Sequence, residues 1–289
     1  MIQEEQVELW AQGERLSAGV FRPQEAGQRP ALVISHGAIG CKEQFYPMAR
    51  QLAGLGLTVL VPDMRGHGGS DGARYHVEIP DWKADILASL DWLQAQDDVD
   101  GLRLGALGFS SGGTAVLEAA MTDDRIKAIV TLDATVRPIL SRLEIWLFRG
   151  LGSLGLLKRR LLGSDLHLPL YPLARMTPSA VDPAVNQAVF DDPHIKAGYW
   201  HYPIPGALDS FVIDTLDRVG AIKAPVCVLH GEEDRVDSPE TARALFRGLT
   251  CEKALHLVPG SGHMGHLDQS RDVIYRHAAE WLQRWLLKA

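Results

Sequence analysis

The chain has 289 residues, of which 46% are hydrophobic and 22% are charged, so it can bury a substantial core and has the composition of an ordinary globular protein. Its formal net charge is -7 at pH 7, and its Lys and Arg residues are scattered, which argues against a nucleic-acid-binding protein. The three cysteines have no metal-ligand spacing and leave an odd thiol, which is typical of a reducing compartment. With no signal-peptide pattern and no bilayer-length apolar run, we expect a cytoplasmic protein.

Short β-type runs alternate with helix-length segments along most of the chain. The expected strands, in order, are 7–10, 16–21, 31–35, 57–61, 102–107, 128–132, 226–230 and 255–258. The first two predict a hairpin turning at Gly13, and most of the later runs lack polar alternation, as expected for strands covered on both faces. Helices are expected over 43–55, 81–96 and 271–288. This alternation predicts an α/β fold class with a doubly wound, mostly parallel sheet.

Residues 136–215 break this rhythm with a leucine-rich stretch followed by a proline-rich passage. A structureless loop of this length inside a domain is improbable, so we expect an inserted, mainly helical cap. The predicted organisation is therefore an α/β core formed by 1–135 and 216–289, interrupted by a cap subdomain over 136–215.

The most informative motif is Gly108-Phe109-Ser110-Ser111-Gly112, which follows an apolar run and passes into a helix-forming stretch. A G-x-S-x-G motif on a strand–turn–helix holds its serine in a strained conformation and pushes the hydroxyl out above the end of the sheet. Ser110 is therefore the candidate nucleophile. Ser70 also lies in a G-x-S-x-G pattern, but no strand precedes it directly, so we interpret it as a loop residue.

A serine nucleophile needs a base that is itself held by an acid. His263 follows the run 255–258 and Asp234 follows the run 226–230, so two further strand ends can bring these side chains to Ser110. Alternatives to Asp234 are Asp237, which is close in sequence, and Asp133, which follows an earlier strand. The alternative base is His266, three residues beyond His263.

Attack on an acyl carbon also requires backbone N–H donors for the negatively charged oxygen. The N–H of Ser111, directly after the nucleophile, is expected to be one donor. The second should come from the loop after strand 31–35, where we assign the N–H of Ala38, with Ile39 as the alternative.

Taken together, these motifs resemble the α/β-hydrolase superfamily of serine hydrolases. The resemblance covers both ends of the predicted core and rests on five motifs in the expected order: HGAIG, DMRGHGGSDG, GFSSGG, HGEED and GSGHMGH. The position of the cap and its segment FDDPHIKAGYW are similar to the cap-bearing lysophospholipase and monoacylglycerol-lipase-type branch. Phe109 and Ser111 depart from that branch, where His and Met often flank the nucleophile, so the acyl pocket should differ.

The resemblance implies a Ser-His-Asp triad of Ser110, His263 and Asp234, an acyl-enzyme, and a small-molecule acyl ester as substrate. It implies no metal and no organic cofactor. Candidate substrate-binding residues are Ile39, Phe109, Trp200 and Phe211, although the cap aromatics could equally pack in a core. The sequence predicts no oligomeric state.

The apolar segment 143–162, with Lys158, Arg159 and Arg160 near its end, has two interpretations. It could be a lid that contacts a membrane surface, or a cap helix that covers the acyl pocket with its basic end in water. We favour the second, because Gly150, Gly152 and Gly155 should weaken a continuous membrane-binding helix.

Three classes of function remain. The first is a carboxylesterase or lipase-like enzyme acting on apolar acyl esters. The second uses the same triad as a peptidase, thioesterase, carbon–carbon bond hydrolase or perhydrolase. The third, a hydrolase-like binding protein without activity, is disfavoured because every catalytic position holds a competent residue.

Overall fold

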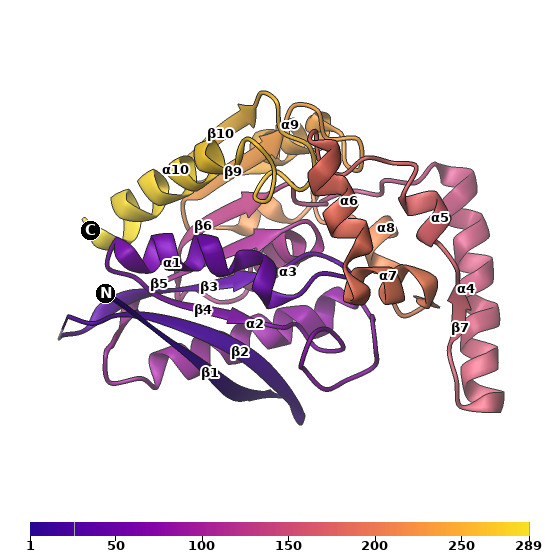
Figure 1. Ribbon diagram of the computed structural model, residues 1–289, viewed down its shortest axis with the longest axis horizontal. Helices are drawn as coiled ribbons and strands as arrows, with labels where there is room; N and C mark the ends of the chain where they lie inside the picture. Colours follow the sequence, from indigo (N-terminus) through magenta and orange to yellow (C-terminus); the bar gives the residue numbers. More distant parts are fainter. Residues whose placement is uncertain (26, 289) are drawn as a thin grey trace.

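A computed structural model describes residues 1–25 and 27–288. In this part of the chain, eight strands form one sheet in the order β1-β2-β4-β3-β5-β6-β9-β10 (Figure 1). Their bounds are β1 Ile2–Ala11, β2 Glu14–Pro23, β3 Arg29–Ser35, β4 Thr58–Pro62, β5 Val99–Phe109, β6 Ile126–Leu132, β9 Val226–Gly231 and β10 Lys253–Val258. Strands β1 and β2 form the predicted hairpin, and β2 pairs antiparallel with β4. All pairs from β4 to β10 are parallel, so the predicted fold class is confirmed.

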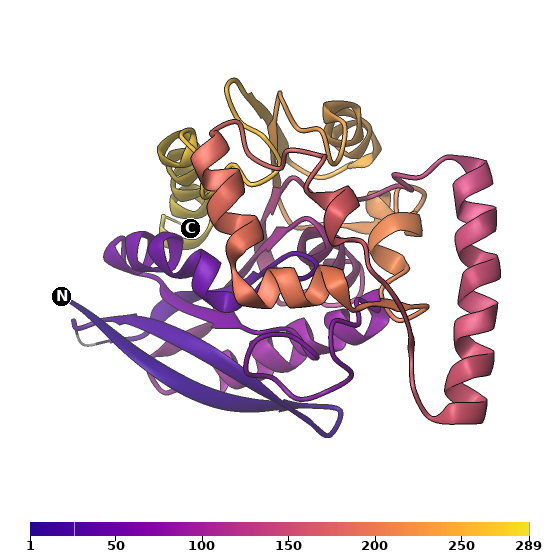
Figure 2. The ribbon, with the colours of Figure 1, turned by 45° about the vertical axis from the view of Figure 1, so that its right-hand side comes forward.

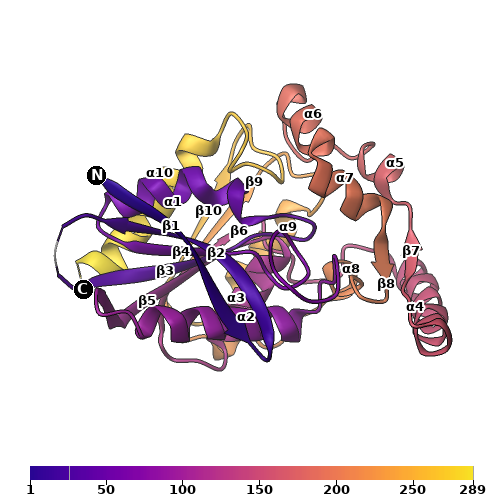
Figure 3. The same ribbon diagram turned by 60° about the horizontal axis from the view of Figure 1, so that its bottom comes forward.

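Helices cover both faces of the sheet (Figure 3). One face packs against α1 (Tyr46–Gly54) and α10 (Arg271–Leu282), and the other packs against α2 (Ile79–Gln94), α3 (Ser111–Ala120) and α9 (Pro239–Gly248). The alternating side chains of β3 show why both faces are apolar, since Val33 enters one core cluster while Leu32 and Ile34 enter the other. This two-sided burial explains the unbroken apolar runs in the sequence.

Two expected helices differ at their ends from the sequence prediction. The segment expected as a helix over 43–55 begins as a 3₁₀ turn, Lys42–Phe45, and α1 starts with Pro47 in its first turn, where the missing N–H of proline costs nothing. The C-terminal helix ends at Leu282 and continues as a short π-helical turn over Gln283–Leu287. Its Ile274 and Trp281 are buried against the sheet, as the apolar stripe predicts.

The 136–215 segment lies beyond the carboxyl ends of the parallel strands (Figures 1 and 2). It contains the elements α4 Arg142–Leu162, β7 Leu166–Leu168, α5 Tyr171–Ala174, α6 Pro183–Asp191, α7 Pro193–Trp200, β8 Tyr202–Ile204 and α8 Asp209–Val212. The short strands β7 and β8 pair antiparallel. A further 3₁₀ turn, Val219–Ala221, leads into β9. No helix in the described part of the chain combines the length and the apolar character that a membrane crossing requires.

Helix α4 corrects one expectation, because it runs unbroken for 21 residues despite its three glycines. Ser141 and Glu144 form a capping box at its start, and Gly163 in the left-handed conformation closes its end. Gly155 lies against β8, where an added Cβ would stand 2.1 Å from the carbonyl oxygen of Ile204. Its glycine therefore permits close packing of α4 on β8 instead of interrupting the helix.

The turn from β5 to α3 brings backbone very close to backbone at the end of the sheet. A Cβ on Gly108 would lie 2.4 Å from the carbonyl oxygen of Gly112, and a Cβ on Gly112 would lie 2.2 Å from that of His36. Because real Cβ atoms do not approach backbone oxygens so closely, only glycine fits at these two positions.

We therefore expect Gly112→Ala to lower the free energy of unfolding by about 2 kcal/mol or more, because the clash is with backbone and cannot be relieved by a rotamer change. The matched control is Gly54→Ala at the end of α1, where an added Cβ meets open space. Urea unfolding of both variants measures the difference. Equal stability of the two variants would contradict this account of the turn.

Candidate active site

Ser110 occupies the predicted strained position between β5 and α3. Its backbone has φ 52° and ψ -123°, a conformation that side-chain-bearing residues rarely adopt. The turn is fixed from the neighbouring strand, since the N–H of Ser110 donates to the carbonyl oxygen of Leu132 at 2.9 Å. The hydroxyl is thereby held at the carboxyl end of the sheet, where it borders a cavity.

The structure brings together the three side chains predicted as nucleophile, base and acid. His263 Nε2 lies 3.1 Å from Ser110 Oγ, and His263 Nδ1 lies 2.7 Å from Asp234 Oδ2. Because an ionised carboxylate only accepts, Nδ1–H donates to Asp234, which leaves Nε2 of the neutral ring to accept from the serine hydroxyl. These contacts form one continuous chain of hydrogen bonds.

Asp234 is held in place by the turn that follows β9. Its Oδ1 accepts hydrogen bonds from the backbone N–H groups of Val236 and Asp237, at 2.8 and 2.9 Å. The alternative acid Asp237 instead accepts from the hydroxyl of Thr241 at 2.6 Å. The turn therefore orients Asp234, not Asp237, toward His263.

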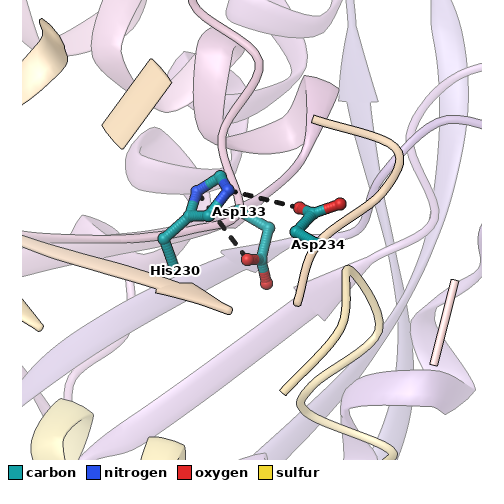
Figure 4. Close-up of side chains that lie close together, drawn as sticks. All are labelled: Asp133, His230 and Asp234. Atoms are coloured by element: carbon teal, nitrogen blue, oxygen red, sulfur yellow. Dashed lines mark ion pairs between the residues drawn. The ribbon is translucent and has the colours of Figure 1, made fainter. Parts of the chain in front are cut away.

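A second histidine lies behind Asp234, together with the other alternative acid (Figure 4). His230 Nε2 lies 3.3 Å from Asp234 Oδ2 and 3.0 Å from the carbonyl oxygen of Asp237. Its Nδ1 faces Asp133 Oδ1 at 3.7 Å. Asp133 also accepts from the N–H of Gly231 at 2.8 Å and has a positive φ of 47°. His230 thus stands between two buried carboxylates.

The ligand atoms of Asp133, His230 and Asp234 all lie within 4.8 Å of one another, a spacing that could suit a metal ion. The imidazole itself, however, fills the space between the carboxylates and faces them through opposite nitrogens. One ion cannot use both nitrogens of a single ring. We therefore interpret this cluster as an ion-pair network.

Burial and charge shift the pKa values of these four groups in different directions. Burial lowers the pKa of both histidines, but the adjacent carboxylates outweigh it, raising the pKa of His230 to about 9 and that of His263 above its ordinary value. Burial raises the pKa of Asp133 to about 7. Burial also opposes ionisation of Asp234, yet its two histidine neighbours hold the pKa of that carboxyl well below its usual range. At neutral pH the Asp234 carboxylate is therefore ionised, and it faces a protonated His230.

The remaining alternatives have structural roles. His266 is buried in an apolar setting, stacked on Phe45 at a ring separation of 4.4 Å, and burial lowers its pKa to about 3. Ser70 Oγ donates to the carbonyl oxygen of Asp63 at 2.6 Å and accepts from the N–H of Ser17 at 2.9 Å. Neither group is free to join the chain of hydrogen bonds between Ser110, His263 and Asp234.

Ala38 and Ser111, the predicted oxyanion donors, both border the cavity beside Ser110. Their backbone N–H groups donate no hydrogen bond to any other described residue. The loop that carries Ala38 is fixed by His36, a residue that the sequence analysis did not single out. His36 Nδ1–H donates to Gly37 O at 2.8 Å and Nε2 accepts from Met64 N–H at 2.9 Å, while burial lowers the ring pKa to about 4.

The cavity at Ser110 has a volume of about 310 Å³ and is lined mostly by apolar side chains. Of the predicted pocket residues, Ile39, Phe109 and Phe211 line it. Trp200 does not, because it lies at the outer surface, 41% exposed and stacked on Tyr171. Lining residues that the sequence analysis did not assign to the pocket include Leu170, which precedes α5, together with Leu173 of α5, Phe190 of α6 and Ile195 of α7.

Helix α4 contributes no residue to the described lining of this cavity. The expectation that the segment 143–162 covers the pocket is therefore wrong. Nor is its basic end simply in water, since Arg159 pairs with Asp165 at 2.6 Å and Lys158 Nζ donates to the carbonyl oxygen of the same residue. The helix packs closely on β8, where Gly155 lies against Ile204.

With this geometry in view, comparison with known families is decisive. The family model described as serine aminopeptidase, S33, matches residues 26–270. The chain belongs to this family. It is an α/β hydrolase, as the motifs of its sequence predict.

Named relatives agree at the level of the family. A monoacylglycerol lipase of Mycolicibacterium smegmatis is 26% identical over 93% of either chain, and a carboxylesterase of Bacillus subtilis is 22% identical over 89% of this chain and 94% of its own. Among solved structures, the α/β hydrolase GrgF from Penicillium sp. sh18 aligns over 99% of both chains with a TM-score of 0.81 at 20% identity. This last similarity supports the fold.

The network behind Asp234 makes stability depend on pH. Because the pKa of His230 is about 9 in the folded protein and its ordinary value is 6.5, its stabilising contribution is complete below pH 6.5 and is lost as pH rises through about 9. We expect His230→Gln to lower the free energy of unfolding strongly at pH 6. At pH 10 the gap between the variant and the parent protein in this free energy should be about 3 kcal/mol smaller. Urea unfolding at both pH values measures the gap, and a gap independent of pH would contradict the assignment.

Proposed function

We propose that this hydrolase cleaves apolar acyl esters with Ser110 as nucleophile, His263 as general base and acid, and Asp234 as the carboxylate that orients His263. The hydrogen bonds of 3.1 Å and 2.7 Å that join these side chains support the proposal. So does the strained backbone of Ser110, which is typical of nucleophile elbows.

In the proposed reaction, Ser110 Oγ attacks the ester carbonyl carbon while its proton passes to His263 Nε2. The imidazolium that forms is stabilised by Asp234, and the N–H groups of Ala38 and Ser111 bind the negatively charged oxygen. His263 then gives its proton to the leaving alcohol. Water repeats the sequence on the acyl-enzyme, which releases the acid and restores the serine.

One observation carries the choice of substrate: no Asp or Glu is among the described residues that line the cavity. An aminopeptidase must hold the positively charged amino group of its substrate, for which a carboxylate is the natural partner. The side chains here are mostly apolar, and Arg235 is the one lining residue besides His263 that can carry a positive charge. An apolar acyl chain fits this lining better than a peptide N-terminus, despite the description of the family model.

The cavity size points to the chain length of the acyl group. A volume of about 310 Å³ lies at the small end of the range of ligand pockets, roughly 300–1,000 Å³. We infer a short or medium acyl chain, enclosed by α5, α6 and α7. In this proposal the 136–215 segment acts as the cap and 1–135 with 216–289 as the core. A cytoplasmic location stays a prediction, to which the three free cysteines are suited.

A panel of p-nitrophenyl esters, aminoacyl anilides and acyl thioesters tests this function. We expect the highest kcat/KM on short or medium acyl esters and negligible turnover of aminoacyl anilides, because the lining offers no carboxylate for an ammonium group. Ser110→Ala should lower kcat by roughly 10⁴-fold or more, since triad residues act as a unit.

Ser70→Ala is the matched control, because it removes a buried serine of the second G-x-S-x-G pattern that is bonded away from the cavity. It should keep the kcat of the parent protein. Strong anilide turnover with little ester turnover would overturn the ester assignment, and full activity of Ser110→Ala would overturn the site.

A further inference from the structure

Helix α4 exposes a continuous apolar stripe on its outer face. Six large side chains of this stripe are between 50% and 71% exposed: Leu143, Trp146, Leu147, Leu154, Leu157 and Leu161. On the opposite face of α4, Gly155 packs against Ile204 of β8, and Gly152 packs against Leu208, which follows that strand. Figure 2 shows α4 at the edge of the molecule, and no other described element lies against its outer side. A stripe this long is unusual for the surface of a monomer and indicates an interaction site.

The spacing within the stripe is that of a coiled-coil seam. Leu143, Leu147, Gly150, Leu154, Leu157 and Leu161 follow one another at intervals of 4, 3, 4, 3 and 4 residues. This is the heptad pattern in which alternate a and d positions pack into a facing helix. The pattern continues through almost the whole length of α4, so the natural occupant of this face is another helix with the same spacing.

We propose that the occupant is α4 of a second copy of this chain, running antiparallel. In this antiparallel arrangement each residue of the heptad pattern meets another residue of the pattern in the second copy when their two residue numbers add to 304. Leu143 then faces Leu161 of the second copy, Leu147 faces Leu157, and Gly150 faces Leu154. Each of these layers pairs a d position with an a position, as antiparallel coiled coils require. A two-fold axis near residue 152 relates the copies, so both copies use the same surface of α4 for the contact.

Gly150 fits this arrangement because the space outside it is empty, with nothing within 4 Å of where a Cβ would lie. The Leu154 side chain of the second copy can enter that space. A glycine at a seam position would otherwise leave a gap between two rows of leucine. The gap and the leucine opposite it are therefore complementary in this register.

The flanking residues are complementary in the same register. Glu144 of one copy comes beside Lys158 of the other, and Trp146 comes beside Arg160, so the two-fold axis generates each contact twice. The first is an ion pair and the second a cation–π contact. This matters because α4 carries Arg142, Arg149, Lys158, Arg159 and Arg160 against a single Glu, and an unmatched pairing of two such helices would be repulsive.

A lipid surface is the rival occupant, because a basic, leucine-rich helix is also suited to an anionic membrane. The placement of α4 favours the second copy. A helix that passes a lipid substrate to the active site should border the cavity, and α4 supplies none of its described lining. The lipid surface is therefore treated as an outcome of the test.

The mass of the full-length protein in solution tests the proposal. By size-exclusion chromatography with light scattering at roughly 50 μM, we expect twice the chain mass of 31.7 kDa, falling toward the monomer on dilution. Leu154→Glu should give monomer at the same concentration, because it buries a charge in the seam of both copies.

Leu156→Glu is the matched control: Leu156 is 55% exposed on the same helix but lies outside the stripe, so this variant should stay dimeric. Circular dichroism of both variants shows that loss of the dimer is not loss of fold. A monomeric parent protein at this concentration overturns the proposal, as does a dimer that Leu154→Glu leaves intact. A monomer that floats with vesicles of phosphatidylcholine and phosphatidylglycerol, and loses this binding in Leu154→Glu, assigns the stripe to lipid instead.

Cysteine cross-linking tests the direction of the two helices. In the antiparallel register, Leu143→Cys mixed with Leu161→Cys should oxidise to a heterodimer, while each variant alone should stay uncrosslinked. The unaltered protein, with its native cysteines, is the background control. Cross-linking of each variant with itself would show a parallel pair and contradict the register.

Discussion

The close approach of backbone to backbone around Gly108 and Gly112 is the constraint on which the site depends. It forces β5 into α3 through a single strained residue, and the N–H of Ser110 anchors that residue to the end of β6. The hydroxyl is therefore positioned by main chain alone, before any partner reaches it. Parallel strands then place the other two groups, since β9 lies next to β6 and β10 next to β9, and the turns that follow β9 and β10 carry Asp234 and His263.

Charge is also compensated in the buried cluster behind Ser110. Asp234 stays ionised in a buried position because it faces two histidines and two backbone N–H donors. His230 in turn separates it from Asp133, so that the second carboxylate does not compete for His263. A buried carboxylate stays ionised only where its charge is compensated, and His230 contributes to that compensation beside Asp234.

The sequence predicted most of the fold, because two-sided burial leaves unbroken apolar runs and each run became a strand. It also predicted which side chains meet, because Ser110, Asp234 and His263 each follow a strand whose end lies at the same edge. The sequence did not predict side-chain contacts between neighbouring strands of the sheet. His230 reads as an ordinary strand residue, and its contact with Asp133 exists only because β6 and β9 are neighbours.

The 136–215 segment was the least predictable part for a related reason. Trp200 and Phe211 are both aromatic and nearby in sequence, yet packing places one at the surface and the other in the cavity. The glycines of α4 suggested a weak helix. In the structure, Gly155 permits close packing of α4 on β8, and Gly150 lies in the outer stripe. Composition gives helix content here, but only the three-dimensional arrangement shows which face each residue serves.

The central claim is that His263 activates Ser110, and its most direct test is reaction with a fluorophosphonate followed by peptide mass spectrometry. In this reaction a bond forms between Ser110 Oγ and phosphorus, fluoride leaves, and the serine proton passes to His263. The account predicts modification of Ser110 alone, much slower in a His263→Gln variant. Modification of Ser70, or equal rates in the parent protein and the variant, would contradict it.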